Sequence, residues 1–110
     1  WSNASTPAPC SIGPETAAAL EQLYAEALTT RPDDWMLRRN TGMAYVALGL
    51  AAKALPQLNR ALAVIPDDPD TLYALGRAHQ ALGHAAESDR FFAQVRALEP
   101  RYPGLPAEAP

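Results

Sequence analysis

Apolar residues recur three or four positions apart along most of the chain, and short polar or proline-containing breaks divide them into five segments. This spacing predicts five amphipathic helices, because it places the apolar side chains of each segment on one helical face. We expect the helices over residues 14–30, 35–48, 51–64, 69–82 and 85–98. The first carries a stripe of Leu20, Leu23, Tyr24, Ala27 and Leu28.

The breaks between the segments carry residues that begin and end helices. Asp33-Asp34 and Asp67-Asp68 precede two of the expected helices, where a carboxylate can accept hydrogen bonds from free backbone amides. Pro69 follows directly, and proline is favoured at the first helical position. Gly49 and Gly83 stand where a left-handed glycine commonly ends a helix. These local signals agree with the apolar pattern.

The chain also repeats itself. Pro32, Pro66 and Pro100 follow one another at intervals of 34 residues, and Gly42 and Gly76 share this offset. A fixed period of this length is typical of a repeat array, in which one supersecondary unit is copied and stacked. The question of function therefore becomes which partner the array binds, rather than which reaction it performs.

The 34-residue helix–turn–helix unit resembles the tetratricopeptide repeat. In residues 69–102 the resemblance rests on Leu72, Leu75, Gly76, Gly83, Phe92 and Pro100, with departures at His79, Ser88 and Val95. In residues 35–68 it rests on Gly42, Tyr45, Gly49, Ala54, Leu58, Ala61 and Pro66, with departures at Arg38 and Thr41. Residues 14–34 match only the second-helix half, so the chain holds about two and a half repeats.

This resemblance implies an all-α fold of antiparallel helical hairpins, stacked as a short right-handed superhelical solenoid. It also implies a non-catalytic scaffold that binds a peptide or protein segment in a concave groove. Family members that clamp a C-terminal carboxylate use lysine, arginine and asparagine side chains. Arg39 matches one basic position, but Met43 and Ala74 replace the amides, so this activity is not expected.

The resemblance places the groove on the first helix of each hairpin, and helical spacing selects the residues on that face. In the two copies these are Met36, Arg39, Met43, Val46 and Ala47, then Asp70, Tyr73, Arg77, Gln80 and Ala81. Adaptable methionines, an aromatic and arginines suit a peptide-binding strip. We predict peptide contacts for Met36, Arg39, Met43, Tyr73, Arg77 and Gln80. In the alternative interpretation, the two arginines are ordinary solvated residues.

A second function stays open, that of a structural or oligomerisation appendage of a larger protein. Two and a half repeats lie below the three that such arrays normally need for stability. No polar capping helix is expected after Pro100, so Phe91 and Val95 could lie beside an exposed apolar strip. This alternative predicts a homo-oligomer with contacts at these two residues.

Charge and composition exclude several classes of partner. The net charge is −3, whereas nucleic acids and anionic membranes attract a basic face. No apolar run reaches the length of about 20 residues that a membrane span needs. A single cysteine, Cys10, cannot form an internal disulfide and leaves the compartment open between bacterial cytoplasm and periplasm. The alanine-rich composition is common in bacteria.

The sequence shows no catalytic or metal-binding constellation, so we expect no enzyme activity, no cofactor and no metal. His79 and His84 are five residues apart and are not expected to share a helical face as a metal-binding pair does. His79 belongs to the core stripe, where it replaces an aromatic residue, and His84 follows the Gly83 turn. Cys10 has no neighbouring base.

Three parts follow along the chain. Residues 1–13 are expected to be a disordered lead-in, in which Ser2-Asn3-Ala4 resembles the remnant left by a tag-removing protease. Residues 14–100 form the helical repeat domain. Residues 101–110 contain three prolines and a glycine, and they are expected to form a tail without a helix.

Overall fold

The computed structural model describes residues 14–106, which form five helices and no strand. The helices are α1 (Pro14–Thr30), α2 (Trp35–Ala47), α3 (Ala51–Val64), α4 (Pro69–Ala81) and α5 (Ala85–Leu98). The all-α prediction is confirmed, and the helix boundaries agree with the predicted ones to within one residue. The predictions for residues 1–13 and 107–110 lie outside the described residues.

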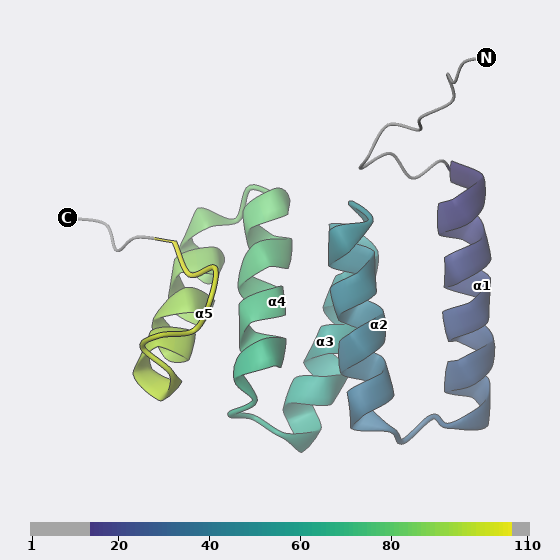
Figure 1. Cartoon of the computed structure of the whole chain (residues 1–110), viewed down its shortest axis with the longest axis horizontal. Coiled ribbons are helices and arrows are strands. Elements are labelled where there is room, and N and C mark those ends of the chain that lie inside the picture. Colours follow the sequence, from purple (N-terminus) through teal and green to yellow (C-terminus); the bar gives the residue numbers. More distant parts are fainter. Residues whose placement is uncertain (1–13, 107–110) are drawn as a thin grey trace, which may run out of the picture.

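The helices form two antiparallel hairpins, α2–α3 and α4–α5, which stand side by side (Figure 1). Helix α4 packs against both α2 and α3, so α2 and α4 become neighbours across the junction between the hairpins. Helix α1 lies at one end of the row and α5 at the other (Figure 1). This arrangement is the short helical-repeat solenoid that the sequence predicts.

The ends of the helices follow the expected chemistry. The Asp34 carboxylate accepts a hydrogen bond from the Leu37 amide at 3.1 Å, and Asp68 accepts one from the Thr71 amide at 3.1 Å. Gly49 has φ of +79°, a left-handed conformation that side chains rarely adopt, and it ends the turn after α2. These features fix where each hairpin reverses direction.

Glycines let the two helices of each hairpin approach closely. A Cβ atom on Gly42 would lie 2.5 Å from Cγ of Leu58, and one on Gly76 would lie 2.6 Å from Cε1 of Phe92. Both large side chains are buried, which removes apolar surface from water. Each glycine therefore provides the space that one bulky side chain of the partner helix fills.

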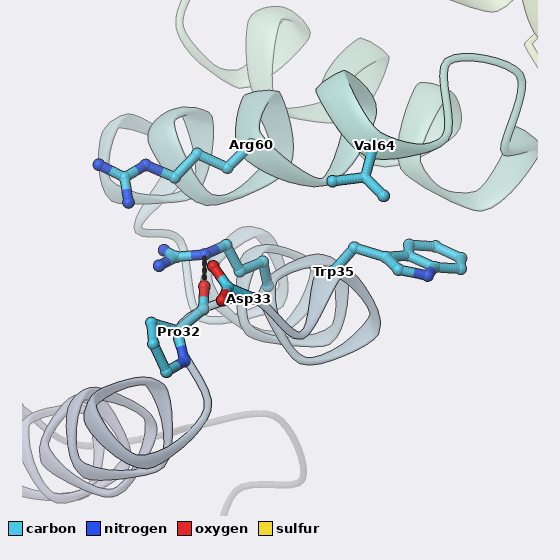
Figure 2. Close-up of a pocket in the computed structure, with 6 residues that line it drawn as sticks. Pro32, Asp33, Trp35, Arg60 and Val64 are labelled. Carbon is cyan, nitrogen blue, oxygen red and sulfur yellow. Dashed lines mark hydrogen bonds between the residues drawn. The ribbon is translucent and has the colours of Figure 1, made fainter.

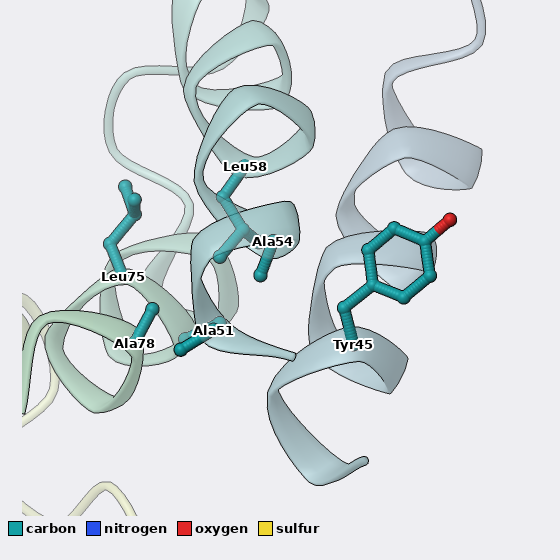
Figure 3. Packing of buried hydrophobic residues seen from close by; sticks show 7 residues of the cluster. Tyr45, Ala51, Ala54, Leu58, Leu75 and Ala78 are labelled. Atoms are coloured by element: carbon teal, nitrogen blue, oxygen red, sulfur yellow. The ribbon is translucent and has the colours of Figure 1, made fainter. Parts of the chain in front are cut away.

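The main core lies between the hairpins. Figure 3 shows Ala54 and Leu58 of α3 facing Leu75 and Ala78 of α4, all of them buried. Because four positions of this core cluster are alanines, Ala51, Ala54, Ala74 and Ala78, the backbones can come close together. This packing holds α2 and α4 in fixed positions relative to each other.

Helix α1 packs less extensively than the other helices. Its Tyr24 ring meets Tyr45 edge to face, with centroids 6.1 Å apart, and its Glu21 pairs with Lys53 of α3. Leu23 belongs to the stripe that the sequence predicts as the packed face, yet its side chain is 61% exposed. The prediction for this residue is wrong, because only one side of α1 has neighbouring helices within the described residues (Figure 1).

Of the two residues expected to contact a second copy, Val95 needs correction. Val95 is completely buried, and the Phe91 ring is half-buried and stacks on His79 with centroids 5.5 Å apart. Val95 therefore offers no surface to a second copy in this structure. The residues after α5, 101–106, form no helix, as expected, and they lie against α4.

Candidate functional site

A cavity of about 280 Å³ opens between α2 and α4. Its walls come from both hairpins, and we call it the α2–α4 groove; it is lined by Met43, Val46, Ala47, Tyr73, Ala74 and Arg77. Five of these six residues are on the face that the sequence analysis selects. The sixth, Ala74, lies next to Tyr73 on α4 and is buried.

Arg39 apart, the predicted contact residues divide into two sets. Met43, Tyr73 and Arg77 line the α2–α4 groove together, where Met43 is exposed and the Arg77 side chain reaches solvent. Met36 and Gln80 are exposed but are not among the residues that line it. Whether any of these six residues contacts a peptide remains a prediction.

Arg39 has a structural environment of its own. Its guanidinium lies 3.4 Å from Asp68 and 3.8 Å from Asp70, and it stacks over the Trp35 ring at 5.2 Å. Only 16% of the side chain is exposed. The neighbouring carboxylates neutralise its charge, so Arg39 ties α2 to the start of α4 and thereby fixes one end of the groove.

The residues after α5 contribute contacts that the sequence analysis did not anticipate. The Tyr102 ring packs on Tyr73 with centroids 4.9 Å apart, and its hydroxyl donates a hydrogen bond to Asp70 at 2.6 Å. Burial and the Asp70 carboxylate raise the pKa of Tyr102 well above its usual value. The Tyr102 hydroxyl therefore stays protonated and remains a donor.

Tyr73 connects these residues to the groove. Its hydroxyl donates to the Gly104 carbonyl at 3.2 Å and accepts a hydrogen bond from Arg77 at 3.0 Å. We call residues 101–106 the tail segment. No periodic signal in the sequence places this segment, because its contacts depend on how the chain folds back after α5.

A second cavity, of about 270 Å³, lies beside the turn between α1 and α2 and is lined by Pro32, Asp33, Trp35, Arg38, Arg60 and Val64. Figure 2 shows that the Trp35 ring and the Arg60 guanidinium point away from each other. Arg38 is held by hydrogen bonds to the Pro32 carbonyl and to Gln57. This cavity does not direct its aromatic and cationic groups toward one common ligand.

The two histidines lie closer together than their spacing suggests. The turn at Gly83 brings the Nδ1 atoms of His79 and His84 to 3.0 Å, although the two residues do not lie on one helical face. Burial and the neighbouring His84 lower the pKa of His79. Within residues 14–106, no cluster of three or more side chains is arranged to hold a metal ion. Among the described helices, none combines the length and apolar character of a membrane span.

Comparison with known proteins identifies the repeat. The family model described as TPR repeat matches residues 42–83. The chain is 37% identical over 90 residues to cellulose synthase operon protein C of Escherichia coli strain K12, a match that covers 82% of this chain and 8% of that protein. A protein of the same name from Pseudomonas fluorescens is 29% identical over 83 residues, covering 76% of this chain and 6% of that protein. No solved structure matches the chain.

The matched relatives are bacterial, and the chain spans less than a tenth of their length. The family model covers the second half of α2 and the whole of α3 and α4. All the residues that line the α2–α4 groove lie within this range. The 34-residue period, the paired helices and the family match agree with one another: the chain belongs to the tetratricopeptide repeat family.

Proposed function

We propose that this chain is a protein-interaction segment that binds a peptide or a segment of another protein in the α2–α4 groove. Tetratricopeptide repeats generally serve as non-catalytic scaffolds for protein partners. The observation that carries the proposal is that Met43, Tyr73 and Arg77, which come from two different repeats, line one cavity of about 280 Å³.

The chemistry of the groove supports a polypeptide ligand. Met43 and Val46 supply an adaptable apolar wall on α2, while Tyr73 and Arg77 supply an aromatic ring and hydrogen-bond donors on α4. Such a combination buries apolar side chains of a ligand and satisfies its backbone carbonyls or carboxylates. The alternative of an oligomerisation appendage is favoured by one observation, the 61% exposure of Leu23 on α1.

The chain spans 8% of the Escherichia coli relative, so we propose that the segment works as part of a longer protein. The name of that relative refers to a cellulose synthase operon. The proteins encoded beside this chain's own gene are therefore the first partners to test.

The test is co-purification of partners with the chain and three charge variants from the bacterium that encodes it. Met43→Glu and Arg77→Glu should each reduce recovery of a specific partner at least about tenfold, because they place a carboxylate in the groove. Arg60→Glu, which makes a charge change of the same size as Arg77→Glu in the second cavity, should leave recovery unchanged. Equal recovery with all three variants would refute the groove as the binding site.

A further inference from the structure

We propose that the tail segment, residues 101–106, is an intramolecular ligand of α4 that occupies Tyr73, a wall residue of the α2–α4 groove, and that the partner which displaces it presents a tyrosine-containing segment of similar chemistry. This inference rests on the proposed function, because it assigns the ligand chemistry of the same site.

The first contact is aromatic. The Tyr102 ring lies on Tyr73 with an angle of 39° between the rings, and Tyr73 in turn packs against the buried Phe92 at 5.7 Å. Tyr102 thus extends a row of aromatic rings that begins in the core of the second hairpin. An aromatic pair of this kind is favourable beyond the burial of its surface. The surface of α4 therefore offers a platform for one tyrosine ring.

The second set of contacts is polar. The platform has an acceptor for the tyrosine hydroxyl, Asp70, and a donor for a backbone carbonyl, the Tyr73 hydroxyl. The backbone comes so close that a Cβ atom on Gly104 would lie 2.6 Å from the Tyr73 oxygen, and Gly104 has φ of +86°. The platform thus holds one side chain, Tyr102, and one backbone carbonyl, that of Gly104. Peptide-binding sites commonly combine these two kinds of contact.

The repeat register shows that the tail segment replaces an expected element. Tyr102 stands 34 residues after Asp68, which caps α4. Pro103 and Gly104 follow where the next helix of an array would begin, yet residues 101–106 form no helix. In this structure, residues of the segment 101–106 contact α4 instead.

The tail segment and a partner in the groove share one residue, Tyr73. Tyr73 and Arg77 line the groove, but the Tyr73 hydroxyl is already engaged with both Gly104 and Arg77. A partner carbonyl that accepts a hydrogen bond from the Tyr73 hydroxyl must take the place of the Gly104 carbonyl, because the hydroxyl has a single hydrogen to donate. Because the tail segment is tethered, it competes at an effective concentration in the millimolar range and weakens the apparent affinity of a partner.

The experiment uses the full chain, its Tyr102→Ala variant, and a synthetic peptide with the sequence of residues 99–106, capped at both ends. Backbone amide signals of Tyr73, Ala74 and Arg77 are followed by NMR during titration. We expect saturable shifts in Tyr102→Ala, and about tenfold more peptide needed for the same shifts in the unchanged chain. A control peptide with alanine in place of the tyrosine should produce no shifts.

Equal titration of both chains, or no shift in Tyr102→Ala, would overturn the inference. Tyr102→Phe keeps the ring and removes the hydrogen bond to Asp70, so the amount of peptide it needs should lie between those of the other two chains. It is also the control for the case in which the alanine variant does not fold. In the co-purification experiment, Tyr102→Ala should increase partner recovery several-fold. If Arg77→Glu abolishes recovery but Tyr102→Ala does not raise it, the proposed function stands and the competition by the tail segment is refuted.

Discussion

In the first hairpin, α2 and α3 meet where Leu58 fills the space above Gly42, whereas in the second hairpin the larger Phe92 ring fills the space above Gly76. The two hairpins come from one 34-residue template, so these positions correspond. Phe92 also contacts Tyr73 on the groove side. In the second hairpin, the core residue Phe92 thus contacts a residue of the candidate binding site. The corresponding core residue of the first hairpin, Leu58, has no such ring contact within the described residues.

The buried hydroxyl groups of the two hairpins also differ, because Ser88 of the second hairpin is hydrogen-bonded and Thr41 of the first has no partner in the described part of the chain. Ser88, buried in the second hairpin, donates a hydrogen bond to the Gly76 carbonyl at 3.0 Å, and its counterpart in the first hairpin is Ala54. Thr41 is buried in the first hairpin, and its hydroxyl has no hydrogen-bond partner within the described residues. Its counterpart is Leu75. The comparison indicates that the second hairpin is the more stable unit and provides the firm wall of the groove.

The largest expected effect comes from truncating the two bulky side chains. Phe92→Ala should lower the free energy of unfolding by about 4 kcal/mol and Leu58→Ala by about 3 kcal/mol, because each leaves a cavity above a glycine. Urea denaturation followed by circular dichroism measures both values. A loss for Leu58→Ala that equals or exceeds that for Phe92→Ala would contradict the ranking of the hairpins.

The helix caps should differ by a smaller amount. Asp68 accepts hydrogen bonds from both the amide and the hydroxyl of Thr71 and also faces Arg39, whereas Asp34 accepts one from the Leu37 amide. We expect Asp68→Ala to cost about 2 kcal/mol and Asp34→Ala about 1 kcal/mol. Amide hydrogen exchange at Thr71 and Leu37 reports each cap separately. Equal losses would show that the second cap has no advantage.

The buried hydroxyls give effects of opposite sign. Thr41→Val keeps the shape of the side chain and removes an unpaired polar group, so it should stabilise the protein by about 1 kcal/mol. Ser88→Ala removes a satisfied hydrogen bond and should destabilise it by about 1 kcal/mol. Thermal unfolding at pH 7.5 measures both. Destabilisation by Thr41→Val would mean that its hydroxyl is satisfied in solution.

The smallest effect is a dependence on pH that belongs to the second hairpin alone. Because the pKa of His79 is lowered in the folded protein, folding favours the neutral imidazole. Its contribution to the free energy of unfolding is therefore complete above the unfolded pKa of about 6.5. This contribution is lost as the pH falls below that value. Of the charged groups nearby, Glu87 opposes the lowering and Arg90 adds to it.

We therefore expect the melting temperature to fall by a few degrees between pH 7.5 and pH 5. The double variant His79→Tyr/His84→Leu, which copies Tyr45 and Leu50 of the first hairpin, should remove this decrease. An unchanged decrease in the double variant would assign it to other groups.

The sequence predicted the helices well, because their signals are local or periodic. Gly49, Gly83 and the aspartate caps act within a few residues, and the 34-residue offset identifies the glycines that face Leu58 and Phe92. The resemblance to the repeat family, together with helical spacing, also selected Met43, Tyr73 and Arg77, which the fold brings together.

The remaining features depend on tertiary contacts that no period encodes. The Arg39 ion pairs require α2 and α4 to lie side by side, and the His79–His84 contact requires the turn between α4 and α5. The position of Tyr102 depends on how a proline- and glycine-containing segment folds back. Leu23 was misplaced because periodicity shows that a face is apolar but not whether a neighbour covers it.

Site-specific photo-crosslinking in the bacterium that encodes the chain tests the central claim most directly. A photoreactive residue at Met43, inside the α2–α4 groove, is compared with one at Ala52, which is exposed on α3. We predict that the Met43 position gives a discrete crosslinked protein, which is reduced by Arg77→Glu, and that the Ala52 position does not. Crosslinking to the same protein from Ala52 alone, or from both positions equally, would contradict binding in the groove.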